Sequence, residues 1–307
     1  MIPVIILQGP TAVGKSSIAM EIAGNFETDI ISADSRQVYK FLDIGTAKPS
    51  QQEQNEIKHH LIDIIKPEQV YSAGDFAKDS SSIIKELHSK NKIPLVVGGT
   101  GFYIKSIIEG IFNSPEVPNE IRENLKKLAE EKGGEYLHKK LQQVDPESAV
   151  RVNSTDLNRN IRALEIFEFT GKTITQLWRE NPPEKRDFRF FNILITDERE
   201  KLYKRINHRV DEMLEKGLLR EIEKLLDMGY TKSSPGLNTV GYKELIPHIK
   251  NGASIDICTE EIKQHTRNFA KRQFTWYRKI DFDLTIASSD IRFYAVYKKI
   301  NDFLNLN

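Results

Sequence analysis

The feature that most constrains the fold is a short apolar run that leads through a glycine-framed octapeptide into a helical pattern. Val4–Leu7 is apolar, residues 9–16 read GPTAVGKS, and Ser16–Ala23 has helical character that Gly24 and Asn25 end. A short, continuous apolar run is typical of a parallel strand buried on both faces. Where such a strand, loop and helix follow one another, backbone N–H groups of the loop and helix N-terminus converge on an anion. The sequence therefore predicts an α/β protein with a phosphate-binding loop.

The octapeptide satisfies the pattern G-x-x-x-x-G-K-[ST] in the strand-to-helix context that the pattern requires. Lys15 adds a point charge, and the hydroxyl of Ser16 is a predicted ligand of Mg²⁺. The pattern predicts a bound phosphate but does not specify ATP. The predicted diphosphate- or nucleotide-binding residues are Gly9, Pro10, Thr11, Ala12, Val13, Gly14, Lys15 and Ser16.

Two further apolar runs and a helix between them extend this pattern. Ile30–Ala33 and Ile93–Val97 resemble buried strands, and Asp75–Ser89 has the periodicity of a helix. Alternation of strand and helix is typical of a parallel sheet wrapped by helices. We therefore expect a P-loop NTPase-like parallel sheet flanked by helices.

The character of the chain changes after residue 112. Pro115 and Pro118 interrupt it, a charged, helix-rich stretch follows, and a strand-like run resumes only at Phe190–Ile195. We expect a core in residues 1–112, an inserted all-helical subdomain in 113–187, and completion of the core in 188–307, where the C-terminal part is mostly helical. Gly217 and Gly229 are expected to end helices there.

Composition excludes several classes of protein. The 307 residues carry 45 Lys and Arg against 44 Asp and Glu, which argues against a surface uniformly coated in positive charge. The single cysteine, Cys258, excludes an intramolecular disulfide and a cysteine-clustered zinc site, and suits a reducing cytosol. No apolar run approaches the roughly 20 residues of a membrane span. Ile2–Leu7 is too short for a signal peptide, so we expect a cytoplasmic protein with no membrane partner.

The charge is unevenly distributed along the chain. Residues 1–80 hold 7 Lys and Arg against 11 Asp and Glu, whereas residues 261–279 hold 6 against a single glutamate. Within the second segment, residues 267–278 read RNFAKRQFTWYR and interleave basic with aromatic side chains. RNA-binding proteins use that mixture for phosphate contacts and base stacking. An amphipathic helix that packs Phe269, Phe274 and Trp276 into the core explains the pattern equally well.

Polar residues at strand ends supply candidates for chemistry. Asp34 follows the second strand, at the sheet edge where open α/β folds bind ligands, and is a metal ligand, a general base or a helix cap. Gly98–Gly101 ends another strand at the same edge, with Thr100 offering a hydroxyl. Arg205 and Arg209 lie one turn apart on a helix predicted over 200–216, and one of them could reach a phosphate. The pair His59-His60 is more readily structural than metal-binding.

An ordered set of short motifs resembles the tRNA dimethylallyltransferases (tRNA isopentenyltransferases). No cysteine–histidine zinc module of the eukaryotic relatives is present, so the resemblance is to the bacterial type. Besides residues 9–16, the matching stretches are 34–39 (DSRQVY), 43–49 (DIGTAKP), 59–63 (HHLID), 72–76 (SAGDF), 98–103 (GGTGFY), 162–165 (RALE), 240–244 (VGYKE) and 271–276 (KRQFTW).

The resemblance implies that dimethylallyl diphosphate donates its prenyl group to N6 of adenosine 37 in tRNA, beside the anticodon. It assigns the phosphate-binding loop, with Lys15, to the diphosphate of the donor, Mg²⁺ to the same site, and Arg209 to the departing diphosphate. It makes Asp34 the general base and places Thr100 beside the reacting groups. The target base is expected to be flipped out of its stack. We expect the enzyme to act as a monomer.

The resemblance also implies which residues contact the tRNA anticodon stem-loop. At Asn158 and Asn160 the chain departs from its relatives, which often carry Arg and an apolar residue there. The expected tRNA-binding residues are Asp34, Ser35, Arg36, Gln37, Thr100, Arg122, Asp156, Leu157, Asn158, Arg159, Asn160, Asn238, Thr239, Val240, Gly241, Tyr242 and Lys243, to which the basic segment adds Lys271 and Arg272.

Two alternatives remain from the sequence. A P-loop small-molecule kinase would place Lys15 on ATP and Asp34 on Mg²⁺ or substrate, which explains the first 110 or so residues but not the basic aromatic segment. A non-catalytic RNA-binding NTPase would use the loop as a switch.

Overall fold

The computed structural model describes all residues except 113–114, 183–186 and 306–307, and it contains two compact units. The core unit comprises Met1–Ile108 and Arg186–Asn307, and the helical unit comprises Glu109–Lys185. The expected boundary between residues 112 and 113 adjoins a stretch outside the described residues, as does the expected end of the insertion at 187.

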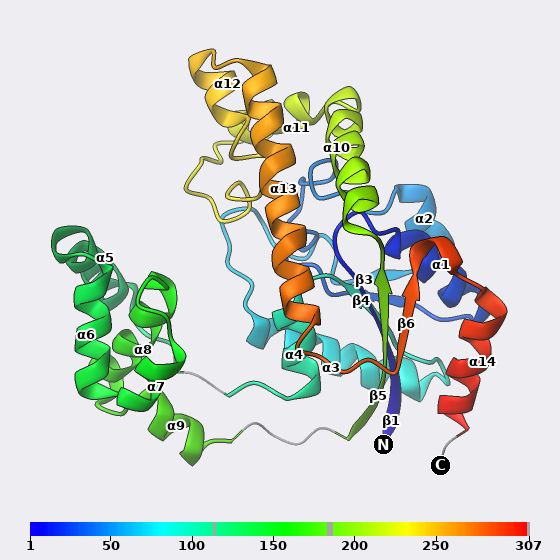
Figure 1. The fold of residues 1–307 in the computed structure, drawn as a ribbon, viewed down its shortest axis with the longest axis horizontal. Helices are drawn as coiled ribbons and strands as arrows, with labels where there is room; N and C mark the ends of the chain where they lie inside the picture. The colour runs from blue at the N-terminus through cyan, green and yellow to red at the C-terminus, as the bar shows by residue number, and fades with distance from the viewer. Residues whose placement is uncertain (113–114, 183–186, 306–307) are drawn as a thin grey trace. The chain divides into compact units, whose positions relative to one another are not determined.

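A six-stranded parallel sheet forms the centre of the core unit (Figure 1). Its strand order is β3-β2-β4-β1-β5-β6, with every neighbouring pair parallel. The carboxyl ends of the strands therefore share one edge, as the expected fold requires. The strands are β1 (Ile2–Gln8), β2 (Ile30–Ser32), β3 (His59–His60), β4 (Leu95–Gly98), β5 (Phe188–Thr196) and β6 (Leu284–Ala287).

Helices cover both faces of this sheet. Apolar residues of β1 and β5 on one face, including Ile5, Leu7 and Ile193, form a cluster with α1 and α14. Side chains alternate along a strand, so Val4 and Ile6 face the opposite side, where α3 contacts β1 and packs on α4. The helices between the strands of the N-terminal part are α1 (Lys15–Asn25), α2 (Gln51–Glu56), α3 (Ala73–Ser89) and α4 (Gly101–Ile108).

The C-terminal part adds a second apolar cluster beside the sheet. Leu218, Ile222 and Leu225 of one helix pack with Tyr242 and with Val38 from the N-terminal part. This cluster holds the loops that follow β2 against the late helices. The elements here are α10 (Arg199–Glu215), α11 (Leu218–Asp227), α12 (Ile246–Asn251), α13 (Ile255–Tyr277), the short 3₁₀ helix η1 (Ser288–Asp290) and α14 (Phe293–Leu304).

The helical unit has an apolar core of its own. Leu125, Leu137, Leu141, Ile161 and Leu164 are buried together, as the helical spacing of apolar residues in this stretch predicts. Its helices are α5 (Asn119–Lys132), α6 (Gly134–Val144), α7 (Pro146–Arg151), α8 (Leu157–Thr170) and α9 (Ile174–Glu180).

The fold predicted from the sequence is confirmed, with two strands added. β3 is only two residues long and β6 only four, too short to show a clear pattern of their own. Both exist because they pair with longer neighbours, β3 with β2 and β6 with β5. Among the described residues, no helix is both long and apolar enough to cross a membrane.

Candidate active site

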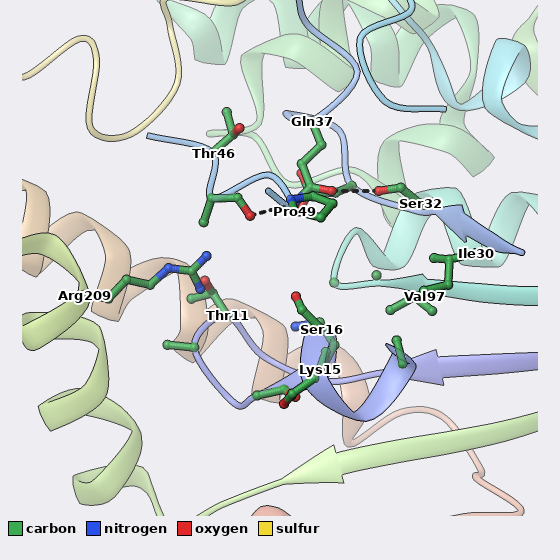
Figure 2. Close-up of a pocket in the computed structure, with 18 of the residues that line it drawn as sticks. Thr11, Lys15, Ser16, Ile30, Ser32, Gln37, Thr46, Pro49, Val97 and Arg209 are labelled. Atoms are coloured by element: carbon green, nitrogen blue, oxygen red, sulfur yellow. Dashed lines mark hydrogen bonds between the residues drawn. The ribbon is translucent and has the colours of Figure 1, made fainter. Parts of the chain in front are cut away.

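A pocket of about 540 Å³ opens at the carboxyl-end edge of the sheet, within the core unit. It is lined by the loop before α1, the ends of β2 and β4, residues 46–49, and side chains from α10 and α13. Figure 2 shows Lys15 and Ser16 facing this space from one side and Gln37 and Thr46 from another. Six of the nine motifs that resemble the prenyltransferases thus contribute to one cavity, and the motifs 72–76, 162–165 and 240–244 do not line it.

The phosphate-binding loop has the backbone that its glycine dictates. Gly14 has a φ of 96° and caps α1 without any side-chain hydrogen bond, so the first N–H groups of α1 are left for another partner. The left-handed backbone at this position favours glycine. Lys15 folds back over the loop, where its Nζ donates to the carbonyl oxygen of Pro10 at 2.8 Å. An anion bound in the loop would compete for that ammonium group.

Lys15, Arg209 and Asp34 influence one another's charge in the pocket, whose lining also includes Arg205, Glu53 and Glu212. Burial lowers the pKa of Lys15 to about 8, against the opposing effect of the Asp34 carboxylate, while Arg209 lowers it further. Burial also lowers the pKa of Arg209, again opposed by Asp34. Lys15 retains partial exposure, but protein atoms surround it densely enough to make charging it costly. A diphosphate bound beside Lys15 and Arg209 would favour the charged forms of both side chains.

Asp34 and Thr100 are held at neighbouring strand ends. Asp34 Oδ1 accepts from the backbone N–H of Arg36 at 2.8 Å, and its carboxylate lines the pocket. Thr100 Oγ1 accepts from the backbone N–H of Ser35 at 3.0 Å. Of the three roles that the sequence left open for Asp34, helix capping is excluded, because a loop without a helix follows it.

Gln37 fixes the wall of the pocket that lies opposite the phosphate-binding loop. Its Oε1 accepts from Ser32 Oγ at 2.9 Å, and its Nε2 donates to the carbonyl oxygen of Ala47 at 3.2 Å, as the dashed lines in Figure 2 show. Both amide atoms are thus engaged within the protein in this conformation. Thr46 and Ala47 complete this wall.

Gln273 joins α13 to the phosphate-binding loop, and sequence reasoning missed it. Its side chain, 7% exposed, accepts from the backbone N–H of Thr11 and donates to the carbonyl oxygen of Gly99, both at 2.9 Å. One helix turn later, the hydroxyl of Tyr277 donates to the carbonyl oxygen of Gly9. The glutamine lies inside the motif 271–276, in which the sequence pattern indicated roles only for Lys271, Arg272 and the aromatic residues.

The two candidate arginines of α10 separate clearly. Arg205 forms an ion pair with the buried carboxylate of Asp197, to which Ser288 also donates. Arg205 and Arg209 both line the cavity, and in Figure 2 the guanidinium of Arg209 extends toward it. Arg209 is therefore the arginine that can meet an anion bound at the loop.

The basic aromatic helix packs some of its aromatic side chains into the core and exposes others. Phe274 packs against the core cluster, and the ring of Trp276 fills the space over Gly101, where a Cβ would collide with it. Phe269, in contrast, is 39% exposed and lines the pocket, with the Arg272 guanidinium 5.6 Å from its ring centroid. Lys271 is exposed beside Arg272.

The adjacent histidines point in different directions, as expected for a structural pair on a strand. His60 Nε2 bonds to Asp29 at 2.9 Å, and Lys92 bonds to the other oxygen of that carboxylate. His59 Nδ1 lies 2.8 Å from the carbonyl oxygen of Ile57. His59 also lines the pocket, which the sequence did not indicate.

The expected tRNA-contacting loop of the core unit, Asn238–Lys243, is partly buried. Asn238 is exposed and Lys243 is half-buried, whereas the side chains of Thr239 and Tyr242 are buried. Thr239 Oγ1 donates to the carbonyl oxygen of Gly236. Side chains of this loop that could reach a ligand are therefore those of Asn238 and Lys243, with Val240 half-buried.

In the helical unit, exposure divides the expected residues in the same way. Asp156 caps α8 by accepting from the N–H of Arg159. Asn160 is fully buried, and its Nδ2 donates to the carbonyl oxygen of Asn153. Leu157, Asn158 and Arg159 are exposed. Arg122 is half-buried, with one guanidinium nitrogen 3.9 Å from the buried Glu165 carboxylate.

The oxygen donors of the pocket suit a magnesium ion carried by a diphosphate. Ser16 is exposed and lines the cavity with Asp34, and hydroxyl and carboxylate oxygens are ligands that Mg²⁺ accepts alongside phosphate and water. Within the described ranges, no group of three or more His, Cys, Asp or Glu residues could hold a metal ion alone.

Fold and pocket together define a P-loop protein in which a phosphate cradle faces a carboxylate and an arginine, an arrangement suited to group transfer from a phosphorylated donor. The sequence model of the IPP transferase family matches residues 37–280. The chain belongs to this family.

Curated relatives and solved structures agree with this assignment. The tRNA dimethylallyltransferase of Acetivibrio thermocellus is 46% identical over 282 residues, which cover 91% of this chain and 89% of that protein. The crystal structure of the full-length tRNA isopentenylpyrophosphate transferase from Bacillus halodurans is 33% identical, with a TM-score of 0.71 and coverage of 99% and 96%. A eukaryotic dimethylallyltransferase described as acting on tRNA is 29% identical, with a TM-score of 0.79 and coverage of 99% and 80%.

Proposed function

We propose that this protein transfers the dimethylallyl group of dimethylallyl diphosphate to N6 of adenosine 37 in tRNA and releases diphosphate. Membership of the family supports the reaction class. The observation that carries the proposal for this chain is the pocket that unites Lys15 and Arg209 with Asp34. Prenyl transfer needs cations that stabilise the departing diphosphate and a base that accepts the proton of the attacking amine.

The cations lower the barrier to C–O cleavage. In an allylic diphosphate, positive charge on C1 spreads over the allyl system as the bond to oxygen breaks, and negative charge grows on the leaving group. Loop N–H groups, Lys15 and Arg209 are fixed before the reaction and stabilise that charge as it forms. Mg²⁺ held by the diphosphate and Ser16 would supply further positive charge there.

Asp34 acts as the general base in this proposal. The lone pair of adenine N6 is conjugated with the ring, so the amine is a poor nucleophile until its proton is removed. The Asp34 carboxylate accepts that proton as the new C–N bond forms, while the N–H of Arg36 holds one of its oxygens. Thr100, held by the N–H of Ser35, lies at the neighbouring strand end.

The pocket also offers apolar surface for the prenyl chain. Ile30 and Val97 line the cavity and lie together at the side away from Arg209 in Figure 2. A donor with its diphosphate on the loop could direct its five-carbon chain toward these residues. Apolar contact there would exclude water, which would otherwise capture the allylic cation.

The adenosine reaches such a pocket only when it leaves the anticodon-loop stack. Phe269, exposed at the pocket and backed by Arg272, offers a flat surface for the extruded base. The basic residues of α13 and the exposed residues of the Asn238–Lys243 loop are our candidates for contacts with the surrounding RNA. We further propose that the enzyme works in the cytoplasm, where its tRNA substrate is found, and as a monomer.

One assay tests this function against the kinase alternative. The protein is incubated with an unmodified tRNA transcript, Mg²⁺ and labelled dimethylallyl diphosphate without ATP, and separately with labelled ATP. We expect label to enter tRNA in the first reaction and to vanish when adenosine 37 is replaced by guanosine. ATP turnover without prenyl transfer would overturn the proposal.

A further inference from the structure

A glutamate outside the pocket ties together two loops that the proposed reaction uses. Glu221 lies in the first half of α11 and does not line the cavity. One of its partners is the wall loop, Asp43–Lys48, whose Thr46 and Ala47 face the pocket. The other is Tyr242 in the expected tRNA-contacting loop, Asn238–Lys243.

The Glu221 carboxylate accepts four hydrogen bonds from these two loops. Its Oε2 accepts from the backbone N–H groups of Asp43 at 3.0 Å and Ile44 at 2.8 Å. Its Oε1 accepts from the N–H of Gly45 at 3.3 Å and from the hydroxyl of Tyr242 at 2.6 Å. Three consecutive N–H groups converging on one anion form a backbone nest. The occupant of this nest is a side chain of the protein itself.

Tyr242 is fitted closely into this junction. Its side chain is 0% exposed, and a Cβ at Gly45 would collide with its ring. Burial, followed by the neighbouring Glu221 charge, raises the pKa of Tyr242 well above its usual value, so the hydroxyl remains a donor. Any side chain at position 45 would push the two loops apart.

The wall loop is held from its inner side as well. The side chain of Lys48 is 3% exposed, and its Nζ donates to the carbonyl oxygen of Tyr39 at 2.6 Å and to Asp43 at 2.7 Å. Beyond the nest, the carbonyl oxygen of Ala47 accepts from Gln37. Displacement of the loop at Glu221 would therefore reach the pocket wall through Ala47.

An ionised carboxylate is the group that satisfies all four donors. An amide at this position has one accepting oxygen, and its NH₂ group would face N–H groups that also donate. Glutamine fits the same space but leaves at least one of these donors without an acceptor on the side chain. A comparison of glutamate with glutamine at position 221 therefore changes the charge of the side chain while keeping its shape.

We infer that Glu221 is a positioning residue that sets the pocket wall and the tRNA-contacting loop relative to one another. The inference rests on the proposed function, because it assigns both loops to one reaction. Glu221 touches no substrate, and it acts through the N–H groups of residues 43–45 and the hydroxyl of Tyr242.

The test compares Glu221→Gln, Tyr242→Phe and the double variant with the wild-type protein. Single-turnover transfer is measured with saturating tRNA and dimethylallyl diphosphate, and the Kd of inorganic diphosphate is measured separately. We expect Glu221→Gln to slow transfer at least tenfold and Tyr242→Phe to slow it less. Diphosphate affinity should change less than twofold, because the phosphate-binding loop is held by Gln273 and not by Glu221. In the double variant, Tyr242→Phe should add almost nothing.

Glu223→Gln is the matched control, since it removes the same charge from an exposed position on the same helix, and it should transfer at the wild-type rate. Rates that multiply in the double variant, or a Glu221→Gln rate equal to that of Glu223→Gln, would overturn the inference. If Glu221→Gln does not fold, an unchanged rate in Tyr242→Phe overturns it instead. If the wild-type protein transfers no prenyl group, the proposed function itself is wrong. That outcome is distinct from the outcomes above, in which the wild-type protein is active and the inference about Glu221 is wrong.

Discussion

At the scale of single residues, the pocket brings Lys15 and Arg209 close enough to affect each other's charge before any substrate arrives. Lys15 carries a pKa of about 8 because it is buried, and the nearby guanidinium of Arg209 adds to the effect. A group that titrates near the working pH responds strongly to its surroundings. A bound diphosphate would restore the lysine's affinity for its proton, so protonation of Lys15 and anion binding are linked.

This linkage predicts a pH dependence for anion binding. Below a pKa of about 8 Lys15 is protonated and binds diphosphate, and above it the ammonium is lost. Between about pH 7 and pH 9 the protonated fraction falls roughly tenfold, so the Kd of inorganic diphosphate should rise by up to about tenfold. Isothermal titration at several pH values measures this change.

Lys15→Arg supplies the comparison, since arginine stays charged over this range. Its pH profile reports only the titration of diphosphate itself and of other groups. Parallel profiles for the wild-type protein and Lys15→Arg would contradict the assignment.

Asp34 yields a prediction about the chemical step. Asp34→Asn keeps an oxygen that can accept from the N–H of Arg36, but it removes the base. We expect single-turnover transfer to fall by about 10²–10⁴-fold, with the Kd for tRNA within a few fold of the wild-type value. Asp227→Asn, which alters an exposed carboxylate in the same unit, should be inert. Transfer by Asp34→Asn near the wild-type rate would remove the general-base role.

Residues whose chemistry is local were predictable from the sequence, and residues that act through long-range contacts were not. The loop 9–16 has a spacing that its function dictates, so Lys15 and Ser16 were found at once. Gln273 accepts a hydrogen bond from a residue 262 positions earlier, and no local sequence pattern near either residue indicates this contact. The same applies to Glu221, three of whose partners lie 176 to 178 positions earlier in the chain.

At the scale of elements, one face of α13 lies toward the phosphate-binding loop and another is exposed to solvent. Gln273 and Tyr277 face inward and hold the phosphate-binding loop, whereas Lys271 and Arg272 are exposed. The sequence could not choose between an RNA-binding helix and a core helix because the helix combines both features. Helical periodicity distributes the two sets over separate faces of the same few turns.

The exposed face of α13 yields a prediction about salt dependence. If Lys271 and Arg272 contact RNA phosphates, the double variant Lys271→Gln/Arg272→Gln should bind tRNA more weakly. The slope of log K against log salt should also become shallower by roughly 1 to 2. Lys298→Gln/Lys299→Gln on α14 removes the same charge from another exposed pair and should leave the slope nearly unchanged. Equal slopes for both double variants would place the RNA elsewhere.

At the scale of the whole molecule, the apolar clusters are divided between two units. The core unit is built on the sheet and its flanking helices, and the helical unit is built on Leu125, Leu137, Leu141 and their neighbours. The formal net charge of the chain is +1. This value hides an uneven distribution along the sequence, because acidic residues dominate the first 80 positions and basic residues gather on α13. The net charge of the whole chain therefore describes neither the acidic N-terminal part nor the basic helix α13.

Separate cores predict that the two units can be destabilised separately. Leu141 is 0% exposed in the helical unit, and Leu141→Ala should cost that unit about 2–5 kcal/mol. Hydrogen exchange should then accelerate in residues 119–180 while amides of β1 and α1 keep their protection. Inorganic diphosphate should bind with unchanged Kd, because every residue that lines its pocket belongs to the core unit. Transfer to tRNA should fall if Leu157–Arg159 contact the substrate.

Leu7→Ala, in the buried centre of the sheet, should show the reverse pattern, with exposed amides in β1 and weakened diphosphate binding. Simultaneous loss of protection in both units of Leu141→Ala would show that the chain unfolds as one body and contradict the division.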